Sequence, residues 1–344
     1  MSLDVVSFGE LSTALAVGFP VDRIYFHGNN KSIEELELAL SKQIGTIVVD
    51  NLMELEVLES LCKKMHQHCN ILVRLNVGVE AHTHKFIVTA HVDSKFGVSY
   101  QSMDYLQMID IIHSSEYIHL NGFHSHIGSQ IFDLNAFTAA IDKLVVICKD
   151  FSYPMVLNIG GGFGVHYTDE DKPIPFNVVS KTLIQACEKA LEKNHVKLAK
   201  LCIEPGRSIV AEAGYTLYTI GYIKETPNKL YYFIDGGMTD NIRPALYQAK
   251  YNADIVGKEH LLKNQIVTIA GKCCESGDLI IEGIPLPMAE SGDLLITYTT
   301  GAYGYSMSSN YNKALTPAVV FVDGSMDKLV CRRQTIEELL EREN

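Results

Sequence analysis

The sequence of 344 residues predicts an α/β fold: a (β/α)8 TIM-type barrel that lacks its first strand, followed by a mostly antiparallel β domain. Short β-rich runs alternate with amphipathic helical segments through roughly the first 210 residues, which is typical of consecutive βαβ units. After about Ala213, β runs are separated by glycine, proline, asparagine and aspartate, as in antiparallel domains. We therefore expect a barrel domain at 1–212 and a C-terminal β domain at 213–344.

The barrel strands are expected at 3–6, 24–26, 46–49, 71–75, 119–126, 155–159 and 200–203. Amphipathic segments such as 9–17, 32–41, 52–66 and 178–193 lie between them, and Ser32 with Glu35 forms a capping box that opens one helix. A closed barrel of this type needs eight strands, and the chain begins directly on a strand, so the missing one is expected before Met1. In the second domain, β runs are expected at 215–223, 230–234, 265–270, 294–299 and 318–322, with one short helix at 335–342.

The composition excludes several classes of protein. The net charge is −12 and no basic run offsets it, which argues against a nucleic-acid-binding surface. The longest apolar stretches are strand-sized, so we expect no membrane span, and the first residues lack the features of a signal peptide. The eight cysteines show no CxxC or zinc-ribbon spacing, which favours small core residues in a reducing, cytoplasmic protein.

Two motifs at successive strand ends predict an anion site. Gly160, Gly161 and Gly162 follow a buried strand, and their bare backbone leaves N–H groups free to close on a phosphate. Arg207 follows the next strand and adds a planar, permanently charged fork. In (β/α)8 barrels, the loops after two successive strands commonly hold a phosphate in this way. The alternative is a tight glycine turn and a surface arginine.

His124 and His126 lie two residues apart at a strand end, so both side chains are expected on one face. A first hypothesis is a metal pair, but the other strand ends offer glycine, glutamate and arginine rather than further ligands. A second is a pair of core histidines bonded to backbone. A third, which the nearby glycines and arginine favour, is that one imidazole stacks on an aromatic cofactor while Gly128 and Ser129 bind its phosphate.

Three further segments carry residues capable of chemistry, each with a structural alternative. Glu204 could keep the nitrogen of a pyridine ring protonated, or it could be a helix cap or a salt-bridge partner. Cys274, beside Cys273 in a polar loop, could donate a proton, or both thiols could pack in a buried turn. Arg243 could bind a substrate carboxylate through two parallel bonds, and the tyrosines of 300–307 could bind ligand or merely pack.

Together these motifs resemble the fold-type III pyridoxal-phosphate decarboxylases, and within them the diaminopimelate decarboxylase family. The resemblance covers essentially the whole chain and includes several long segments. They are 3–7, 25–31, 93–97, 124–130, 160–164, 204–208, 235–247, 273–278 and 300–307. The family's fold is an eight-stranded barrel followed by a β domain, in agreement with the pattern of elements.

The resemblance implies a role for each candidate residue. The cofactor is pyridoxal 5'-phosphate, whose phosphate is expected to be held by Gly160, Gly161, Gly162, Ser129 and Arg207, with Gly206 as a further cofactor-binding residue. His126 would stack on the ring, and Glu204 would pair with its nitrogen. Residues expected to bind substrate are Arg207, Arg243, Tyr247, Glu275 and Tyr303, the last of which also touches the cofactor.

The implied reaction is the decarboxylation of meso-2,6-diaminopimelate to L-lysine, with Cys274 protonating the carbanion. Arginine forks and a glutamate would select this substrate over ornithine, which lacks the second carboxylate. In the family the Cys–Glu pair enters the active site from the partner subunit, so a homodimer is implied. No metal is expected.

One departure from the family pattern concerns the lysine that attaches the cofactor. In the family it lies in a Tyr-x-x-Lys-Ala-Asn strand upstream of the strand that matches 3–7, and Lys31 and Lys95 align with other family lysines. The chain as written starts at that second strand and does not contain this lysine. We therefore expect it to be an incomplete or inactive fragment of a decarboxylase. The alternatives are a pseudo-enzyme that binds pyridoxal phosphate noncovalently and a metal-dependent barrel hydrolase.

Overall fold

The computed structural model describes residues 1–79 and 94–343; Asp93, the first residue of one family landmark, lies outside them. The chain forms two compact units, Met1–Phe163 with Ile174–Pro205, and Gly164–Pro173 with Gly206–Asn344. The second unit thus begins at Gly206, whereas the sequence analysis placed the boundary at 212/213, and it also takes a short segment from within the barrel sequence.

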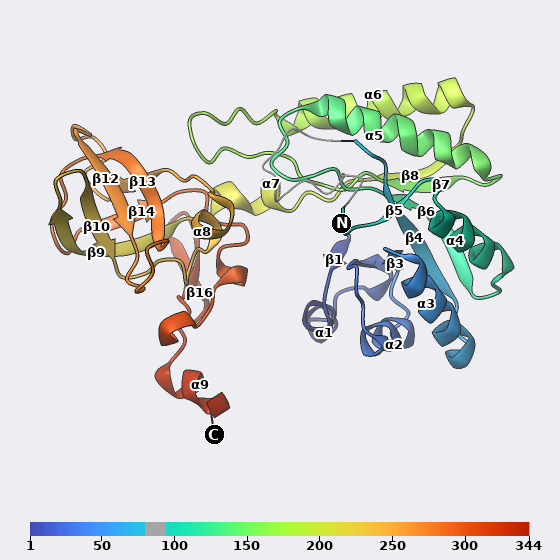
Figure 1. The fold of residues 1–344 in the computed structure, drawn as a ribbon, viewed down its shortest axis with the longest axis horizontal. Helices are drawn as coiled ribbons and strands as arrows, with labels where there is room; N and C mark the ends of the chain where they lie inside the picture. The colour runs from blue at the N-terminus through green and yellow to red at the C-terminus, as the bar shows by residue number, and fades with distance from the viewer. Residues whose placement is uncertain (80–93, 344) are drawn as a thin grey trace. The chain divides into compact units, whose positions relative to one another are not determined.

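The first unit is built on a curved sheet whose strand pairs are all parallel (Figure 1). The strand order is β1 (Leu3–Val5), β2 (Ile24–Phe26), β3 (Thr46–Val49), β4 (Cys69–Asn76), β6 (Ile118–His124), β7 (Met155–Asn158) and β8 (Leu198–Cys202). A two-residue strand, β5 (Val98–Ser99), pairs with β4 and was not expected. Within the described residues β1 and β8 end the order without pairing, which confirms a barrel sheet that is short of one strand.

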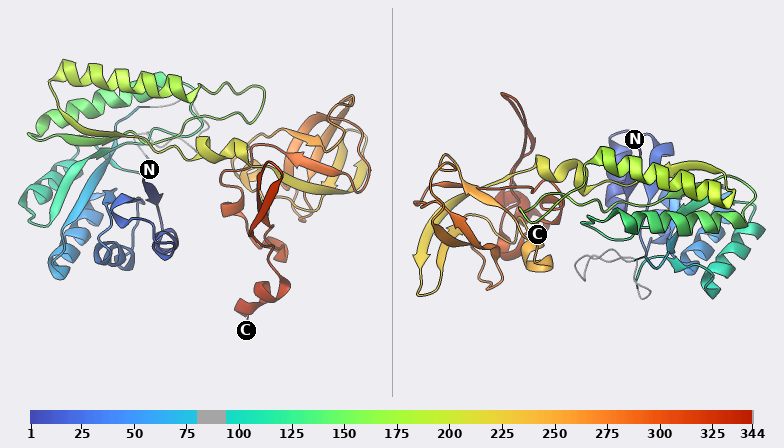
Figure 2. Two further views of the ribbon diagram at one scale, coloured as in Figure 1. Left: turned by 180° about the vertical axis from the view of Figure 1, so that it is seen from behind. Right: turned by 90° about the horizontal axis from the view of Figure 1, so that it is seen from above.

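Six helices alternate with these strands on the outside of the sheet, and α5 and α6 run side by side in both views of Figure 2. They are α1 (Phe8–Ala16), α2 (Ile33–Ser41), α3 (Leu52–Met65), α4 (Met103–Ser114), α5 (Leu134–Ile147) and α6 (Phe176–Asn194). The capping box predicted at Ser32 and Glu35 is present. None of the helices in the described ranges is long and apolar enough to cross a membrane.

Burial on both faces explains why these runs form strands. All four residues of β3 are buried, and Ile24, Phe26, Ile71 and Val73, which share one core with the helices, have no exposed surface. Continuous apolar runs of this kind suit a parallel sheet that is covered on both faces. The helices contribute the rest of one continuous core, so the loops at the strand ends are attached to a rigid frame.

The second unit contains a six-stranded sheet in the order β11 (Ala253–Ile255), β14 (Leu294–Thr297), β9 (Thr216–Glu225), β10 (Leu230–Ile234), β12 (Gln265–Ala270), β13 (Leu279–Leu286). Its pairs are antiparallel except β10–β12. A hairpin of β15 (Val319–Asp323) and β16 (Met326–Cys331) and the helices α7 (Arg207–Val210), α8 (Arg243–Tyr247) and α9 (Ile336–Leu340) complete it. The mostly antiparallel second domain is therefore confirmed.

Three strands and two helices of this unit were not expected from the sequence: β11, β13, β16, α7 and α8. β13 contains Gly283 and Pro285, which are uncommon inside strands, but it pairs with β12 on one side only and tolerates them. β11 has three residues, too few for a period to be visible.

Candidate active site

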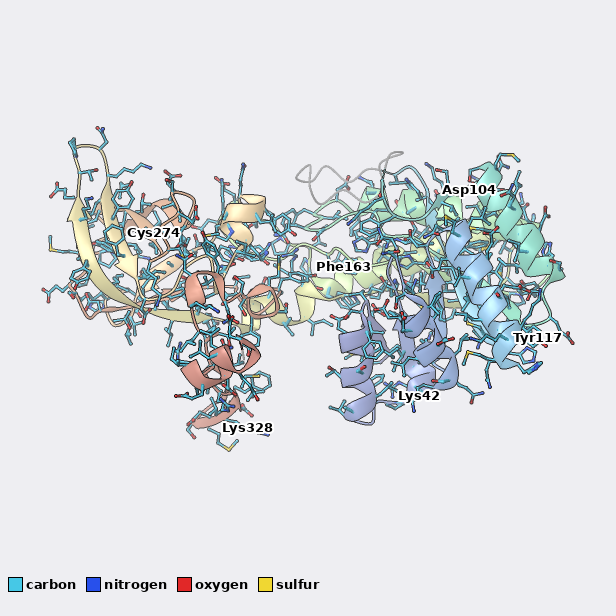
Figure 3. The ribbon with its side chains drawn as sticks, turned by 60° about the horizontal axis from the view of Figure 1, so that its bottom comes forward. Lys42, Asp104, Tyr117, Phe163, Cys274 and Lys328 are labelled. Carbon is cyan, nitrogen blue, oxygen red and sulfur yellow. The ribbon has the colours of Figure 1, made fainter. Side chains whose placement is uncertain are left out.

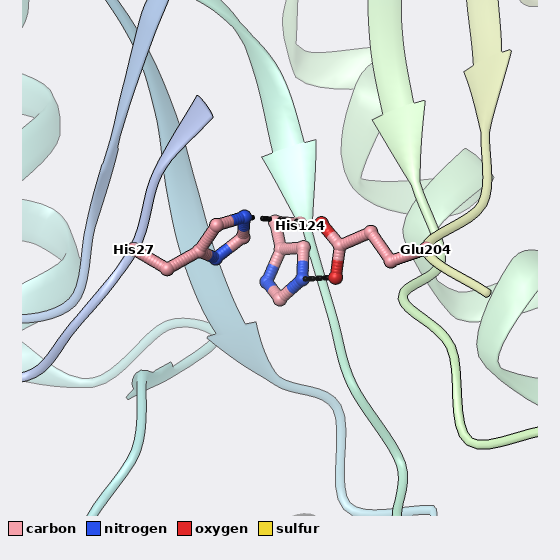
Figure 4. Close-up of side chains that lie close together, drawn as sticks. All are labelled: His27, His124 and Glu204. Atoms are coloured by element: carbon pink, nitrogen blue, oxygen red, sulfur yellow. Dashed lines mark hydrogen bonds and ion pairs between the residues drawn. The ribbon is translucent and has the colours of Figure 1, made fainter. Parts of the chain in front are cut away.

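The carboxyl ends of the barrel strands bring four polar side chains together in the first unit, and Figure 4 shows three of them, His27, His124 and Glu204. His124 ends β6, Asn158 ends β7, and Glu204 follows β8. The Glu204 carboxylate accepts hydrogen bonds from His124 Nε2 at 3.1 Å and Asn158 Nδ2 at 2.6 Å. His27, after β2, places its Nε2 3.2 Å from the other side of the same carboxylate.

These contacts decide the charge of Glu204. Burial alone would raise the pKa of its carboxyl, but the imidazoles of His124 and His27 outweigh burial and hold the pKa well below its usual range. Burial lowers the pKa of His124 to about 4, so at neutral pH this imidazole is uncharged and donates its Nε2–H. The cluster therefore presents one largely buried carboxylate, anionic at neutral pH, that accepts hydrogen bonds from neutral His124 and from Asn158.

A second carboxyl group lies near the same nitrogen of His27. His27 Nε2 is 3.8 Å from Asp4 Oδ1 as well as 3.2 Å from Glu204 Oε1, so two acidic side chains share one imidazole nitrogen. Burial and the charge of Glu204 raise the pKa of Asp4 to about 6, and His27 opposes them. Asp4 thus changes its charge closer to neutral pH than an ordinary aspartate does.

The three glycines after β7 are needed for close packing between loops. A Cβ on Gly161 would lie 1.9 Å from the Glu204 carbonyl oxygen, and one on Gly162 would lie 2.1 Å from that of Gly128. Gly160 and Gly162 also have φ of 69° and 93°, which disfavours any side chain. The phosphate site and the tight turn were the two explanations that the sequence offered for these glycines; the structure adds that the neighbouring strand-end loops require Gly161 and Gly162.

Two of the three glycine N–H groups have partners inside the unit. Gly160 N donates to Asn158 Oδ1 at 3.1 Å, and Gly161 N donates to His126 Nδ1 at 3.2 Å. Burial lowers the pKa of His126 to about 4, so its Nδ1 is an acceptor at neutral pH. Among the residues the structure describes, no group accepts from Gly162 N, which leaves one of the three donors for a ligand.

The loop that carries Ser129 runs beside the same glycines. Ile131 N donates to Gly162 O at 2.8 Å, and Ile131 forms an isolated bridge with Phe163. Ser129, two residues earlier, is half-buried. The first unit thus brings together Glu204, His126, the glycines and the Ser129 loop.

In the second unit, two buried arginines converge on one tyrosine. Arg207 Nη1 donates to the Tyr167 hydroxyl at 2.6 Å, and Arg243 Nη1 donates to it at 3.1 Å. Arg243 also donates to the Tyr251 hydroxyl. The Arg207 guanidinium lies over the Tyr303 ring, 4.8 Å from its centroid. The predicted residues Arg207, Arg243 and Tyr303 are therefore neighbours, joined by two tyrosines that had been assigned no role.

Gly206 and Tyr247 lie at helix ends of this unit. Gly206 is the residue before α7, whose first residue is Arg207, and Tyr247 is the last residue of α8, which Arg243 begins. Tyr247 is half-buried.

The loop 272–278 presents Cys274 at the surface of the second unit, where Figure 3 labels it. Buried Asp278 holds the loop by accepting from Met238 N at 2.6 Å and Cys273 N at 2.9 Å. Cys273 is half-buried, and burial with Asp278 raises the pKa of its thiol. Glu275 is exposed and accepts from the Tyr311 hydroxyl. In the described parts of the chain, neither Cys274 nor Glu275 is hydrogen-bonded or ion-paired to the arginines.

The potential metal ligands differ from the pair that the sequence suggested. Ligand atoms of His27, His124 and Glu204 lie within 4.8 Å of one another, and within the described residues this is the one group of three or more such side chains. His126 does not belong to it, because its Nδ1 faces Gly161.

Sequence reasoning assigned no role to His27, Asn158, Tyr167 or Tyr251. Asn158 carried a signal, since it is a polar residue in an otherwise apolar strand run. His27 lay in a family landmark but gained its importance only from the sheet, which brings β2 within reach of Glu204. The two tyrosines carried no signal among the 17 of the chain.

Comparison with known proteins identifies the family. The family model described as "Pyridoxal-dependent decarboxylase, pyridoxal binding domain" matches residues 1–211. Diaminopimelate decarboxylase of Bacillus methanolicus is 50% identical over 340 residues, which are 97% of this chain and 79% of that protein. The enzyme of Bacillus subtilis (strain 168) is 49% identical over 346 residues, 99% of this chain and 79% of that protein.

Solved structures agree with the sequence relatives. The crystal structure of diaminopimelate decarboxylase from M. jannaschii in complex with L-lysine superimposes with a TM-score of 0.90 at 33% identity, over 99% of this chain and 79% of that chain. A lysine/ornithine decarboxylase from Vibrio vulnificus gives a TM-score of 0.72 at 27% identity, over 90% of this chain and 78% of that chain. The chain belongs to the diaminopimelate decarboxylase family of pyridoxal-dependent decarboxylases, and it is a carboxy-lyase whose cofactor is pyridoxal 5'-phosphate.

Proposed function

We propose that this enzyme decarboxylates meso-2,6-diaminopimelate to L-lysine, as a step of lysine biosynthesis. The observation that carries the proposal is the buried Glu204 carboxylate, kept anionic by His124 and His27 at the ends of a parallel barrel sheet. The relatives from Bacillus methanolicus and Bacillus subtilis, which are 50% and 49% identical and are named diaminopimelate decarboxylases, support the choice of substrate.

The residues at this sheet end fit the cofactor. When bound, pyridoxal phosphate supplies an electron sink for the electrons of the breaking C–CO₂ bond. Glu204 is the partner for the ring nitrogen, because an anionic carboxylate stabilises a protonated nitrogen. His126 is the residue for the ring face. In the loop of Gly160, Gly161 and Gly162, the Gly162 N–H is the donor left for the phosphate, and Ser129 and Arg207 are its other ligands, with Gly206 as a further cofactor-binding residue.

The substrate residues carry charges complementary to a diamino dicarboxylate. The guanidinium forks of Arg207 and Arg243 bind carboxylate, and the exposed Glu275 binds the distal ammonium. Tyr247 and Tyr303 complete the substrate contacts. Ornithine lacks the second carboxylate and would leave a buried arginine without its partner, which is costly.

Cys274 is the proton donor to the substrate carbanion. Its exposure in the single chain, together with that of Glu275, supports a homodimer in which this pair serves the active site of the partner subunit. We place the dimer in the cytoplasm, where reducing conditions keep this thiol free.

We further propose that Lys31 does not attach the cofactor covalently. Its Nζ donates to Gly28 O and Val48 O at 2.8 Å each and to Glu54 Oε1 at 2.6 Å, so all three of its donors are in use. Reduction with sodium borohydride in the presence of pyridoxal phosphate should leave no cofactor on the tryptic peptide that contains Lys31. A cofactor trapped on that peptide would contradict this proposal.

The substrate assignment is tested on residues 1–344 extended by an upstream strand with the family's lysine. Carbon dioxide release is measured from meso-diaminopimelate, ornithine and arginine at equal concentrations. We expect turnover of diaminopimelate well above that of the other two. A clear preference for ornithine would overturn the substrate assignment while leaving the cofactor assignment intact.

A further inference from the structure

The hydroxyl of Tyr167 occupies an unusual position in the second unit, between two buried guanidinium groups. It lies 2.6 Å from Arg207 Nη1 and 3.1 Å from Arg243 Nη1, and the side chains of the two arginines are almost fully buried. Both guanidinium groups also face the Tyr167 ring, at 5.7 Å and 5.0 Å from its centroid. One phenol therefore links two cationic forks.

The hydrogen-bonding capacity of the phenol determines what else it can do. A tyrosine hydroxyl has one O–H donor and oxygen lone pairs for two acceptor bonds, whereas a guanidinium is a donor only. Both arginines must donate to Tyr167, which fills its acceptor positions. The O–H proton of Tyr167 remains, and no group among the described residues accepts it.

Tyr251 shows the contrast within the same cluster. Its hydroxyl accepts from Arg243 and donates to Asn241 Oδ1 at 3.5 Å, so its donor has an acceptor in the protein. The rings of Tyr167 and Tyr251 pack edge to face, with centroids 5.3 Å apart and an angle of 88°. The two phenols are therefore alike in burial and in packing, and they differ in whether the O–H proton is used.

The charge of the cluster indicates the chemical class of the missing acceptor. In the described part of the chain Arg243 has no carboxylate within ion-pair distance, and its hydrogen-bond acceptors are the two tyrosine hydroxyls. A buried cation is stable only when it is paired with an anion or is well hydrogen-bonded. A carboxylate oxygen would accept the Tyr167 O–H and at the same time neutralise the guanidinium.

We propose that Tyr167 is a substrate-binding residue, whose O–H donates to the carboxylate that Arg243 and Arg207 bind. The identity of that carboxylate as part of diaminopimelate rests on the proposed function. The anion site itself does not, because it follows from the two arginines and the unused donor. Tyr251 is the positioning residue that holds Arg243 in this arrangement.

The test compares Tyr167→Phe with Tyr251→Phe, each of which removes one oxygen and keeps the ring. Binding of pimelate and of meso-diaminopimelate is measured by calorimetry; pimelate has two carboxylates and no amine, so it does not react with the cofactor. We expect Y167F to weaken pimelate binding about 10-fold, the effect of one lost hydrogen bond to a charged group. Y251F should weaken it by less than about 3-fold, because no ligand contact is lost. A second measurement avoids the variants: the ¹⁹F resonance of 3-fluorotyrosine placed at 167 should shift with pimelate.

Each outcome decides the inference. Unchanged pimelate affinity in Y167F, equal weakening in both variants, no ¹⁹F shift, or a wild type that binds no carboxylate would each overturn it. Binding of pimelate but not of diaminopimelate by the wild type would refute the proposed substrate, and the role of Tyr167 would then be judged from pimelate alone. In the extended, active enzyme, Y167F should raise KM for diaminopimelate about 10-fold and leave kcat within 3-fold. Partial unfolding would instead lower kcat, because it reduces the amount of active enzyme.

Discussion

Replacing Gly161 by alanine tests whether the glycines after β7 are required by the approach of neighbouring loops. The added Cβ would lie 1.9 Å from the Glu204 carbonyl oxygen and 2.8 Å from its carbonyl carbon. Both obstacles are backbone atoms, so the 160–162 and 204 loops must separate by roughly 1.5 Å to restore an ordinary contact. Gly161 is preferable to its neighbours because its φ is not in the left-handed region, so the clash acts without added backbone strain.

The expected cost comes from overpacking and from the contacts that depend on this approach. Overpacking costs about 1–3 kcal/mol, and a clash between two backbones should lie near the upper value. Moving Glu204 also strains two hydrogen bonds: the one from Glu204 N to Gly160 O at 2.8 Å, and the one from Asn158 Nδ2 to the Glu204 carboxylate at 2.6 Å. We therefore expect G161A to lower the free energy of unfolding by about 3 kcal/mol and to weaken pyridoxal phosphate binding.

The assay is urea unfolding followed by circular dichroism, together with cofactor titration by absorbance. Gly277→Ala is the matched control, because its Cβ would meet nothing within 4 Å and its φ is ordinary. This control should change the free energy of unfolding by less than about 0.5 kcal/mol. If G161A also stays within that range, the close approach of the glycine loop to Glu204 is wrong, and the phosphate becomes the sole reason for a glycine there.

Three further predictions concern charges and thiols. Lys31→Met should cost about 3–5 kcal/mol of unfolding free energy, because it leaves Glu54 buried without its cation, whereas Lys64→Met in the exposed pair with Glu37 should cost at most about 1 kcal/mol. Chemical denaturation checks both, and equal costs would contradict the burial argument. Asp4→Asn should stabilise the protein at pH 8 and have no effect at pH 3. The pKa of Asp4 is raised to about 6 in the folded protein, so the folded state disfavours the ionised carboxylate, and Asp4 lowers the free energy of unfolding once the pH rises through 6. At pH 3 the carboxyl is protonated in both states and this cost is absent. The gain should stay below about 1 kcal/mol, since the side chain is 40% exposed, and a gain that persists at pH 3 would refute the assignment. In the extended enzyme, Cys274→Ala should lower kcat about 10²–10⁴-fold while Cys273→Ala leaves it nearly unchanged; similar small effects would return both thiols to a structural role.

Local patterns in the sequence were sufficient for the barrel. Strand runs such as 46–49 are largely apolar because both faces of a parallel sheet are covered, so their burial is visible without knowledge of their neighbours. Ser32 and Glu35 cap α2 through contacts three residues apart, which a sequence also displays. β11 was missed because three residues show no period, and β13 because Gly283 and Pro285 interrupt its apolar pattern; pairing with β14 and with β12 makes these segments strands.

The sequence by itself therefore determined the fold class, the family and the identity of the chemical groups that follow each strand. Only the tertiary structure decided how those groups act on one another. His27 and Glu204, 177 positions apart in the sequence, meet because the curved sheet brings the ends of β2 and β8, which do not pair with each other, to one polar cluster. Tyr167 contacts Arg243 because the segment Gly164–Pro173, which lies within the barrel sequence, folds as part of the second unit. The charge of Glu204 and the unused donor of Tyr167 are properties of burial and of partners, and neither can be read from residues that are adjacent in the chain.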